Sequence, residues 1–205
     1  MQLALLIKGA VLGFSIAAPV GPIGLLCLRR SLSEGRAAGL ATGLGAATAD
    51  AVYGCVAGFG LTAVSGFLVG QRFWLAQAGG LFLCYLGVRS FLGRSAPRPA
   101  EGRPGGWVPN YLSTFLLTLT NPMTILSFAV LFASFGLGTT PEYGAAGLLV
   151  AGVFLGSAAW WLLLSSTAAL FRARLQDRGM RVINAISGAV LVAFGLLALW
   201  SSFRP

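Results

Sequence analysis

The stretch that decides the fold is residues 3–28, which read LALLIKGAVLGFSIAAPVGPIGLLCL. Lys8 is the only charged residue in it. A helix of about 20 residues crosses the ~30 Å hydrocarbon core of a bilayer, so an apolar run of this length predicts a membrane span. Pro19 and Pro22 lie inside the run, and an interior proline removes a backbone hydrogen bond and clashes with the preceding turn. The run therefore predicts a transmembrane helix that is broken.

The rest of the chain repeats this apolar character. Of the residues, 57% are hydrophobic and 9% are charged, whereas about a quarter of the residues of a soluble domain are charged. The mean hydropathy of +0.84 agrees with a membrane protein. We therefore expect an all-α integral membrane protein, with residues 1–205 as a single transmembrane domain. The expected spans are 3–28, 38–64, 73–92, 110–136, 144–170 and 182–202.

The net charge of +9 predicts topology rather than nucleic-acid binding. The arginines cluster in short connections between apolar runs, where they act as topology signals. The first, third and fifth connections carry Arg29, Arg30, Arg36, Arg89, Arg94, Arg98, Arg103, Arg172, Arg174, Arg178 and Arg181. The opposite side carries Lys8, Arg72 and Arg204. The positive-inside rule thus places the odd connections in the cytoplasm and both termini outside.

The sequence has no ligand pattern for a zinc or iron–sulfur site. It contains no histidine, and Cys27, Cys55 and Cys84 lie singly in apolar stretches without C-x-x-C spacing. We interpret these cysteines as small buried apolar side chains. The sequence predicts no metal site, no cofactor and no mechanism that depends on an imidazole base.

Two halves of the chain resemble each other. Residues 80–87 and residues 188–195 both begin and end with glycine. The first expected span of each half contains proline, at Pro19 and Pro22 in the first half and at Pro122 in the second. With three spans in each half, the second copy must be inverted. We expect a first repeat over about 1–93, a linker over about 94–106 and a second repeat over about 107–205.

Small residues at four-residue spacing form ladders in spans two and five. Such ladders let helices approach closely, so they could also support a homodimer. The ladders consist of Gly39, Gly43 and Ala47 in the first half and Gly152 and Gly156 in the second.

Matched helix breaks in inverted halves are the best sequence indication of a transporter binding site. Gly21 can cap a helix that restarts at Pro22, and Asn121 can cap one that restarts at Pro122. The two restarted helices would direct partial positive charge towards a shared cavity and could hold a carboxylate there, with the Thr124 hydroxyl nearby. The alternative is that the prolines only kink packed helices.

Asp50 is the only acidic residue inside an expected span. A carboxylate at mid-membrane costs about 2.5–3.5 kcal/mol on insertion scales, which favours a functional role. It could bind a substrate ammonium group or carry a proton. The alternative is a structural partner for Tyr53, Thr48 or a loop arginine. Trp160, in span five, is a candidate for a wall of the same cavity.

Several of these features occur together in one order along the chain. The ordered set is Pro-Val-Gly-Pro at 19–22, RRSLSEGRAAGL at 29–40, Asp50 in a glycine-rich span, the segment 80–87 and Asn121-Pro122. Over nearly its whole length the chain resembles the lysine exporter (LysE/RhtB-type) family of bacterial inner-membrane amino-acid exporters. Many members have a tighter Pro-Gly-Pro where this chain has Pro-Val-Gly-Pro.

The resemblance implies export of amino acids or related solutes across the bacterial inner membrane, driven by the proton gradient or the membrane potential. It points to Pro22, Asp50, Asn121 and Pro122 as site residues, and only the resemblance sets the direction of transport. We expect a secondary transporter that binds a small solute between its halves, with membrane lipids around it. The alternatives are a membrane-embedded enzyme acting on lipid-linked substrates and a structural subunit. A lone buried acid argues against the enzyme, which normally needs several catalytic polar groups.

Overall fold

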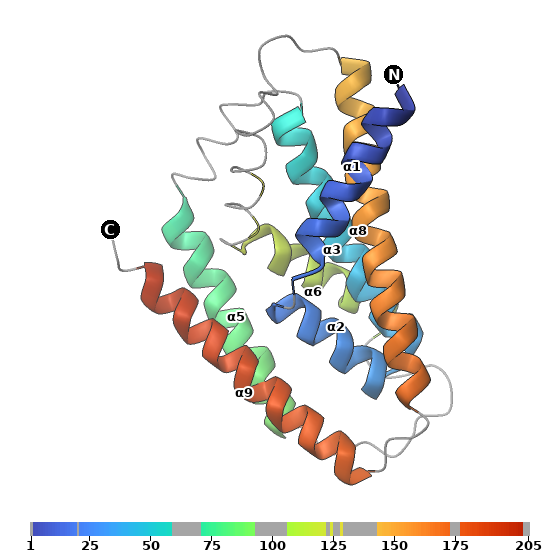
Figure 1. Ribbon diagram of the computed structural model, residues 1–205. Helices are drawn as coiled ribbons and strands as arrows, with labels where there is room; N and C mark the ends of the chain where they lie inside the picture. Colours follow the sequence, from blue (N-terminus) through green and yellow to red (C-terminus); the bar gives the residue numbers. More distant parts are fainter. Residues whose placement is uncertain are drawn as a thin grey trace.

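The computed structural model describes residues 2–19, 21–58, 71–92, 106–121, 124, 128, 143–172 and 177–202. Every element in these ranges is a helix, which confirms the all-α prediction (Figure 1). The helices are α1 (Gln2–Ala17), α2 (Pro22–Ser33), α3 (Arg36–Gly58), α5 (Arg72–Leu92), α6 (Trp107–Leu119), α8 (Tyr143–Arg172) and α9 (Asp177–Ser202).

The expected spans agree with these helices to different degrees. The third, fifth and sixth correspond to α5, α8 and α9, although α9 begins five residues before the expected start. The second corresponds to α3, and its expected end at residue 64 lies outside the described residues. The linker over about 94–106 also lies outside them except for Gly106. The bounds of α5 and α8 lie within two residues of the ends of the apolar runs, because the local sequence is enough to specify them.

The first and fourth spans are not continuous helices over their expected lengths. Span one is divided into α1 and α2, whose axes differ by 82°. Helix α6 ends at Leu119, and of the residues expected to continue span four only Asn121, Thr124 and Phe128 are described beyond Thr120. The two helix ends come two and three residues before Pro19 and Pro122, respectively.

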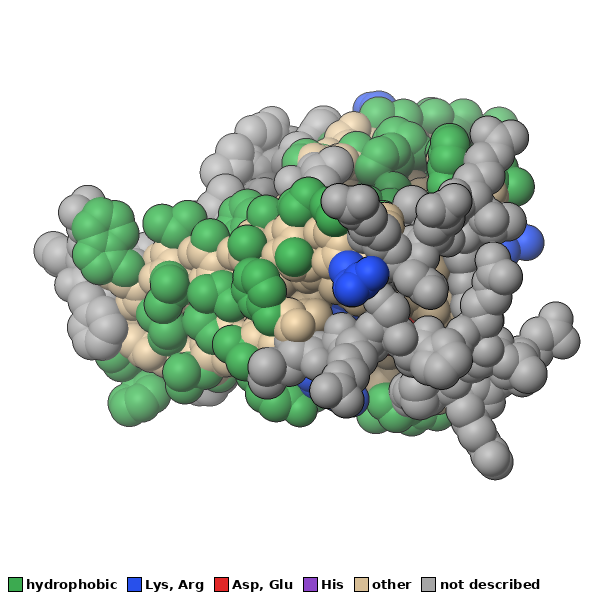
Figure 2. All heavy atoms as spheres, turned by 90° about the horizontal axis from the view of Figure 1, so that it is seen from below, with side chains coloured by type: hydrophobic (Ala, Val, Ile, Leu, Met, Phe, Trp, Pro, Cys, Tyr) green, Lys and Arg blue, Asp and Glu red, His purple; other side chains and the backbone are tan. Residues whose placement is uncertain are grey.

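Two described helices are individually long and apolar enough to cross a membrane, over Gly144–Phe171 and Arg181–Trp200. The bent pair of α1 and α2 makes a third if it is taken as one span. Large apolar side chains point outward from these elements, including Leu3, Leu170 and Leu196, each more than half exposed. In the view from below, hydrophobic side chains gather along the described helices, with backbone and other side chains between them (Figure 2). Such a surface suits a hydrocarbon surrounding.

Helix α2 lies at the centre of the packing. It contacts α3 and α8 on one side and α9 on the other, so that it joins the antiparallel pair α5 and α9 to the other helices (Figure 1). Leu26 and Cys27 of α2 are fully buried in the main core. That core also contains Ala46 of α3 and Leu191 of α9. The break before α2 is therefore what brings a helix into the middle of the molecule.

Close helix approaches occur at glycines. A Cβ atom on Gly156 of α8 would overlap the carbonyl oxygen of Ala10 on α1, and one on Gly13 would overlap that of Val153. The ladder glycines Gly39 and Gly43 likewise meet side chains of this chain, at Ser31 and Trp161. These glycines pack against other helices of the same chain and are therefore not free to form a dimer interface. The homodimer remains a prediction, with no surface assigned to it.

Gly156→Ala should destabilise the protein, because the new methyl group has no room between α1 and α8. Overpacking of this kind costs about 1–3 kcal/mol, equivalent to a fall of about 5 °C in Tm. Thermal unfolding in detergent measures the change. The matched control is Gly147→Ala in the same helix, where a Cβ meets nothing within 4 Å. Equal Tm values for the two variants would contradict the close approach of α1 and α8.

Candidate functional site

The break between α1 and α2 forms one wall of the site. Helix α1 ends at Ala17, and α2 restarts at Pro22 with Gly21 in extended conformation (φ −116°, ψ −165°) as its N-cap. Gly21 has no side chain to cap the helix, and the proline lacks an N–H group. The first turn of α2 therefore presents backbone N–H groups and partial positive charge at the break. The sequence predicted this restart residue by residue.

The end of α6 forms the opposite wall. Thr120 caps the helix with a hydrogen bond from its backbone N–H to the carbonyl oxygen of Leu116 (3.0 Å), and the N–H of Asn121 donates to Thr118 (3.2 Å). Pro122 lies outside the described residues. The expected second restarted helix, directed against the first, therefore stays a prediction.

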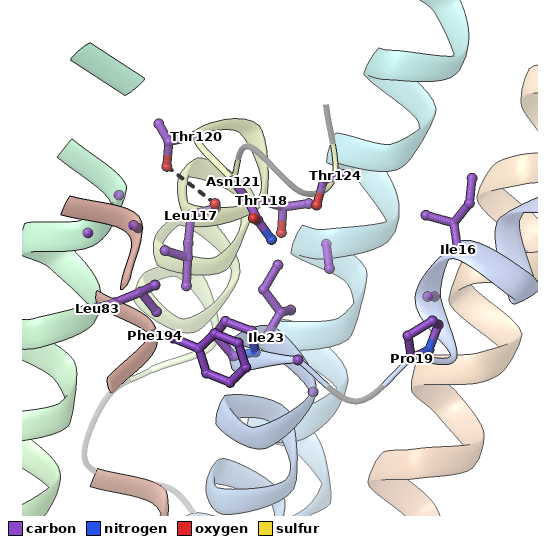
Figure 3. A pocket seen from close by; sticks show the side chains of 18 of the residues that line it. Ile16, Pro19, Ile23, Leu83, Leu117, Thr118, Thr120, Asn121, Thr124 and Phe194 are labelled. Atoms are coloured by element: carbon purple, nitrogen blue, oxygen red, sulfur yellow. Dashed lines mark hydrogen bonds between the residues drawn. The ribbon is translucent and has the colours of Figure 1, made fainter. Parts of the chain in front are cut away.

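A cavity of about 700 Å³ lies between these two walls. Helices α3, α5, α8 and α9 complete its lining, so that every described helix contributes to it. Figure 3 shows Pro19 and Ile23 beside the break and Asn121, Thr118 and Thr124 grouped at the end of α6. A cavity of this size falls in the range of about 300–1,000 Å³ that is typical of small-molecule sites.

Asp50 lines the cavity from α3 and is only 3% exposed. The hydroxyl of Ser157 on α8 donates a hydrogen bond of 2.7 Å to its Oδ2 atom, and the indole N–H of Trp161 donates to Ser157 (3.1 Å). Asp50 is the only ionisable side chain among the described residues of the lining. The Ser157 hydroxyl and the Trp161 indole thus fix the orientation of a lone carboxylate at the cavity.

The partners considered for a purely structural Asp50 make other hydrogen bonds. The hydroxyl of Tyr53 donates to the carbonyl oxygen of Leu119, and that of Thr48 donates to Leu44 of its own helix. Asp50 instead accepts a hydrogen bond from Ser157, a residue that no pattern in the sequence distinguishes.

Six of the residues expected at the site line this one cavity: Pro19, Gly21, Pro22, Asp50, Asn121 and Thr124. Trp160 is not among the lining residues, whereas Trp161 is. Consecutive residues of a helix point about 100° apart. Trp161 lies one turn from Ser157 and faces Asp50, while Trp160 packs edge-on against Phe14 (5.3 Å between ring centroids). No local pattern distinguishes Trp161 from Trp160, because the rotation of α8 depends on its packing against α1 and α3.

A polar cluster around Arg30 is not predicted by the sequence. The sequence predicts Arg30 in a loop at the membrane surface, but Arg30 lies in the last turn of α2 and is 7% exposed. This expectation was wrong because α2 continues past the apolar run and turns the side chain inward. The guanidinium donates hydrogen bonds of 2.9–3.1 Å to four oxygens of α3 and α6: those of Thr42, Thr114 and Ser113, and the Asn110 carbonyl.

A second set of bonds connects the same end of α2 to the α5 and α9 pair. Arg29 donates from Nε to the side chain of Asn184 on α9 (3.3 Å), and Ser90 of α5 donates to the Asn184 carbonyl (2.8 Å). Asn110 of α6 donates to Glu34, which follows α2 (3.0 Å). The end of α2 farther from the cavity is therefore bonded to helices on both of its sides.

Comparisons with known proteins agree along nearly the whole chain. A family model described as LysE type translocator matches residues 14–202. A Bacillus subtilis (strain 168) protein named "Putative amino acid efflux protein YcgF" is 31% identical over 191 residues, covering 90% of each chain. "Uncharacterized membrane protein YahN" of Escherichia coli (strain K12) is 28% identical over 177 residues, covering 84% of this chain and 79% of the relative. No solved structure matches significantly.

Proposed function

Because this chain belongs to the LysE-type translocator family, we propose that it is a secondary transporter that exports amino acids or closely related zwitterions. Members of the family are transporters and not enzymes, and the helices agree with a multi-pass membrane protein. The enzyme alternative has no support in these similarities. The relative named for amino acid efflux supports the choice of solute.

The observation that carries the proposal is the cavity that joins a broken helix to a single buried carboxylate. Asp50 can pair with the ammonium group of an amino acid, since an unpaired charge away from water is costly. The substrate carboxylate can lie at the start of α2, where free N–H groups and the helix dipole favour an anion. Opposite charges held a few ångströms apart are the defining feature of a zwitterion.

We further propose that the halves 1–93 and 107–205 form inverted repeats with six spans. Two packing relationships support this arrangement. Helix α1 packs on α8 while α6 packs on α3, so the first span of each half contacts the second span of the other. In the α5 and α9 pair, a Cβ on Gly80 would meet the Gly195 carbonyl and one on Gly188 would meet the Gly87 carbonyl. A twofold relationship between the halves produces such reciprocal pairs.

Orientation and coupling complete the proposal. The ends of α2 and α5 and the starts of α3 and α9 lie towards the lower end of the molecule, whereas α1 starts at the opposite end (Figure 1). These lower ends carry Arg30, Arg89, Arg36 and Arg181. We assign this end to the cytoplasm of a bacterium, with the chain in the inner membrane and both termini in the periplasm. Asp50 would bind the substrate ammonium and a proton in alternation.

Flux measurements in proteoliposomes test the proposal. The full chain is reconstituted, the vesicles are loaded with radiolabelled leucine, phenylalanine, serine, lysine or glutamate, and a potassium diffusion potential or pH gradient is imposed. Release of at least one amino acid should depend on the protein and stop when an ionophore collapses the gradient. Protein-free vesicles are the control. Absence of gradient-dependent release of every amino acid, with folded protein in the vesicles, would refute the proposed function.

A further inference from the structure

Building on the proposed function, we infer that the exported amino acid carries a bulky, uncharged, apolar side chain. The inference concerns the part of the cavity that does not bind the ammonium and carboxylate groups. Three properties of the lining lead to it: its charge, its apolar wall and its size.

The described part of the lining offers no partner for a charged substrate side chain. The sequence contains five acids, and among the described residues of the lining Asp50 is the only one of them. Glu34 and Asp177 lie at helix ends, at the C-cap of α2 and the first position of α9, and Glu101 and Glu142 lie outside the described residues. Once the substrate ammonium has paired with Asp50, a second cationic group would be desolvated without a counter-charge. An acidic side chain would be repelled by Asp50.

The wall formed by α5 and α9 is apolar. It presents Leu83, Phe194 and Leu197 to the cavity. Leu83 is buried, whereas Phe194 and Leu197 are 38% and 54% exposed, so a solute can cover apolar surface that is accessible on them. In Figure 3 Leu83 and Phe194 lie together, apart from the group formed by Thr118, Asn121 and Thr124. The polar and apolar groups of an amino acid can therefore bind at different sides of the cavity.

The volume favours a large side chain. A cavity of about 700 Å³ leaves space beyond the ammonium and carboxylate groups that a serine or glycine cannot fill. Covering the apolar wall with a leucine-sized or phenylalanine-sized group should favour such substrates over serine by at least about tenfold. Leucine, isoleucine and phenylalanine represent the inferred class.

A substrate panel in proteoliposomes tests the inference. Initial efflux rates at subsaturating concentration are compared for leucine, phenylalanine, serine, lysine and glutamate with the full chain. Leucine or phenylalanine should exceed each of the other three by about tenfold or more. Lysine, glutamate or serine transported as fast as the faster of leucine and phenylalanine would overturn the inference while leaving the proposed function intact. No transport of any of the five would instead refute the proposed function itself.

Substitutions at Phe194 test the apolar wall directly. Phe194→Ala should reduce the preference for phenylalanine over serine severalfold, and Phe194→Asp should raise the rate for lysine relative to leucine, because it adds a second carboxylate. The control is Leu196→Ala on the same helix, which is 56% exposed and does not line the cavity. Unchanged ratios in folded Phe194→Ala protein would overturn the role of the wall, whether or not Phe194→Asp folds.

Discussion

Asp50→Asn should abolish gradient-driven efflux while leaving the protein folded in detergent. The amide has nearly the shape of the carboxylate and can still accept the hydrogen bond from Ser157. It cannot pair with an ammonium group or carry a proton. Removal of one partner of a buried ion pair costs about 3–5 kcal/mol, so the loss of transport should exceed a hundredfold. Efflux from proteoliposomes measures activity, and the elution profile in size-exclusion chromatography measures folding.

Thr48→Ala is the control for this prediction. Thr48 lies in the same helix as Asp50, its hydroxyl bonds within that helix, and it does not line the cavity. Transport by this variant should stay within about twofold of wild type, as expected for a substitution away from a binding site. Full, pH-dependent efflux by Asp50→Asn would contradict both proposed roles of the carboxylate.

Arg30→Met should produce a larger loss of stability than Gly156→Ala. The guanidinium is nearly buried, and its four hydrogen bonds join the end of α2 to α3 and α6. Methionine keeps much of the volume but removes the charged donor from all four oxygens, and a hydrogen bond to a charged group contributes about 1.5–3 kcal/mol. A total on the order of 3 kcal/mol corresponds to a fall of about 10 °C in Tm. Thermal unfolding in detergent measures it.

Arg181→Met is the matched control, because Arg181 is exposed near the start of α9. Its removal should change stability by less than about 0.5 kcal/mol. Arg30→Lys should fall between the two, since an ammonium keeps the charge but cannot reach all four oxygens with its geometry. A Tm for Arg30→Met equal to that of Arg181→Met would show that the cluster does not hold α2 in place.

The sequence alone determined the features that depend on local chemistry. Proline has no N–H group, so Pro19 and Pro22 predicted where α1 would end and α2 would begin, and Asn121-Pro122 predicted the end of α6 within a few residues. The apolar runs predicted helices, and of the five acids only Asp50 lies inside one of these runs. Each of these conclusions needs only neighbouring residues and the polarity of the bilayer core.

Only the tertiary structure decided which side chains meet. Trp161 lines the cavity in place of Trp160 because the rotation of α8 is set by its packing against α1 and α3. Arg30 is buried because the 82° bend directs α2 between helices that are distant in sequence. The apolar wall from α5 and α9 belongs to the site for the same reason. Hydrophobic periodicity specifies which face of a helix is buried, but the partner of that face depends on long-range packing that no local pattern encodes.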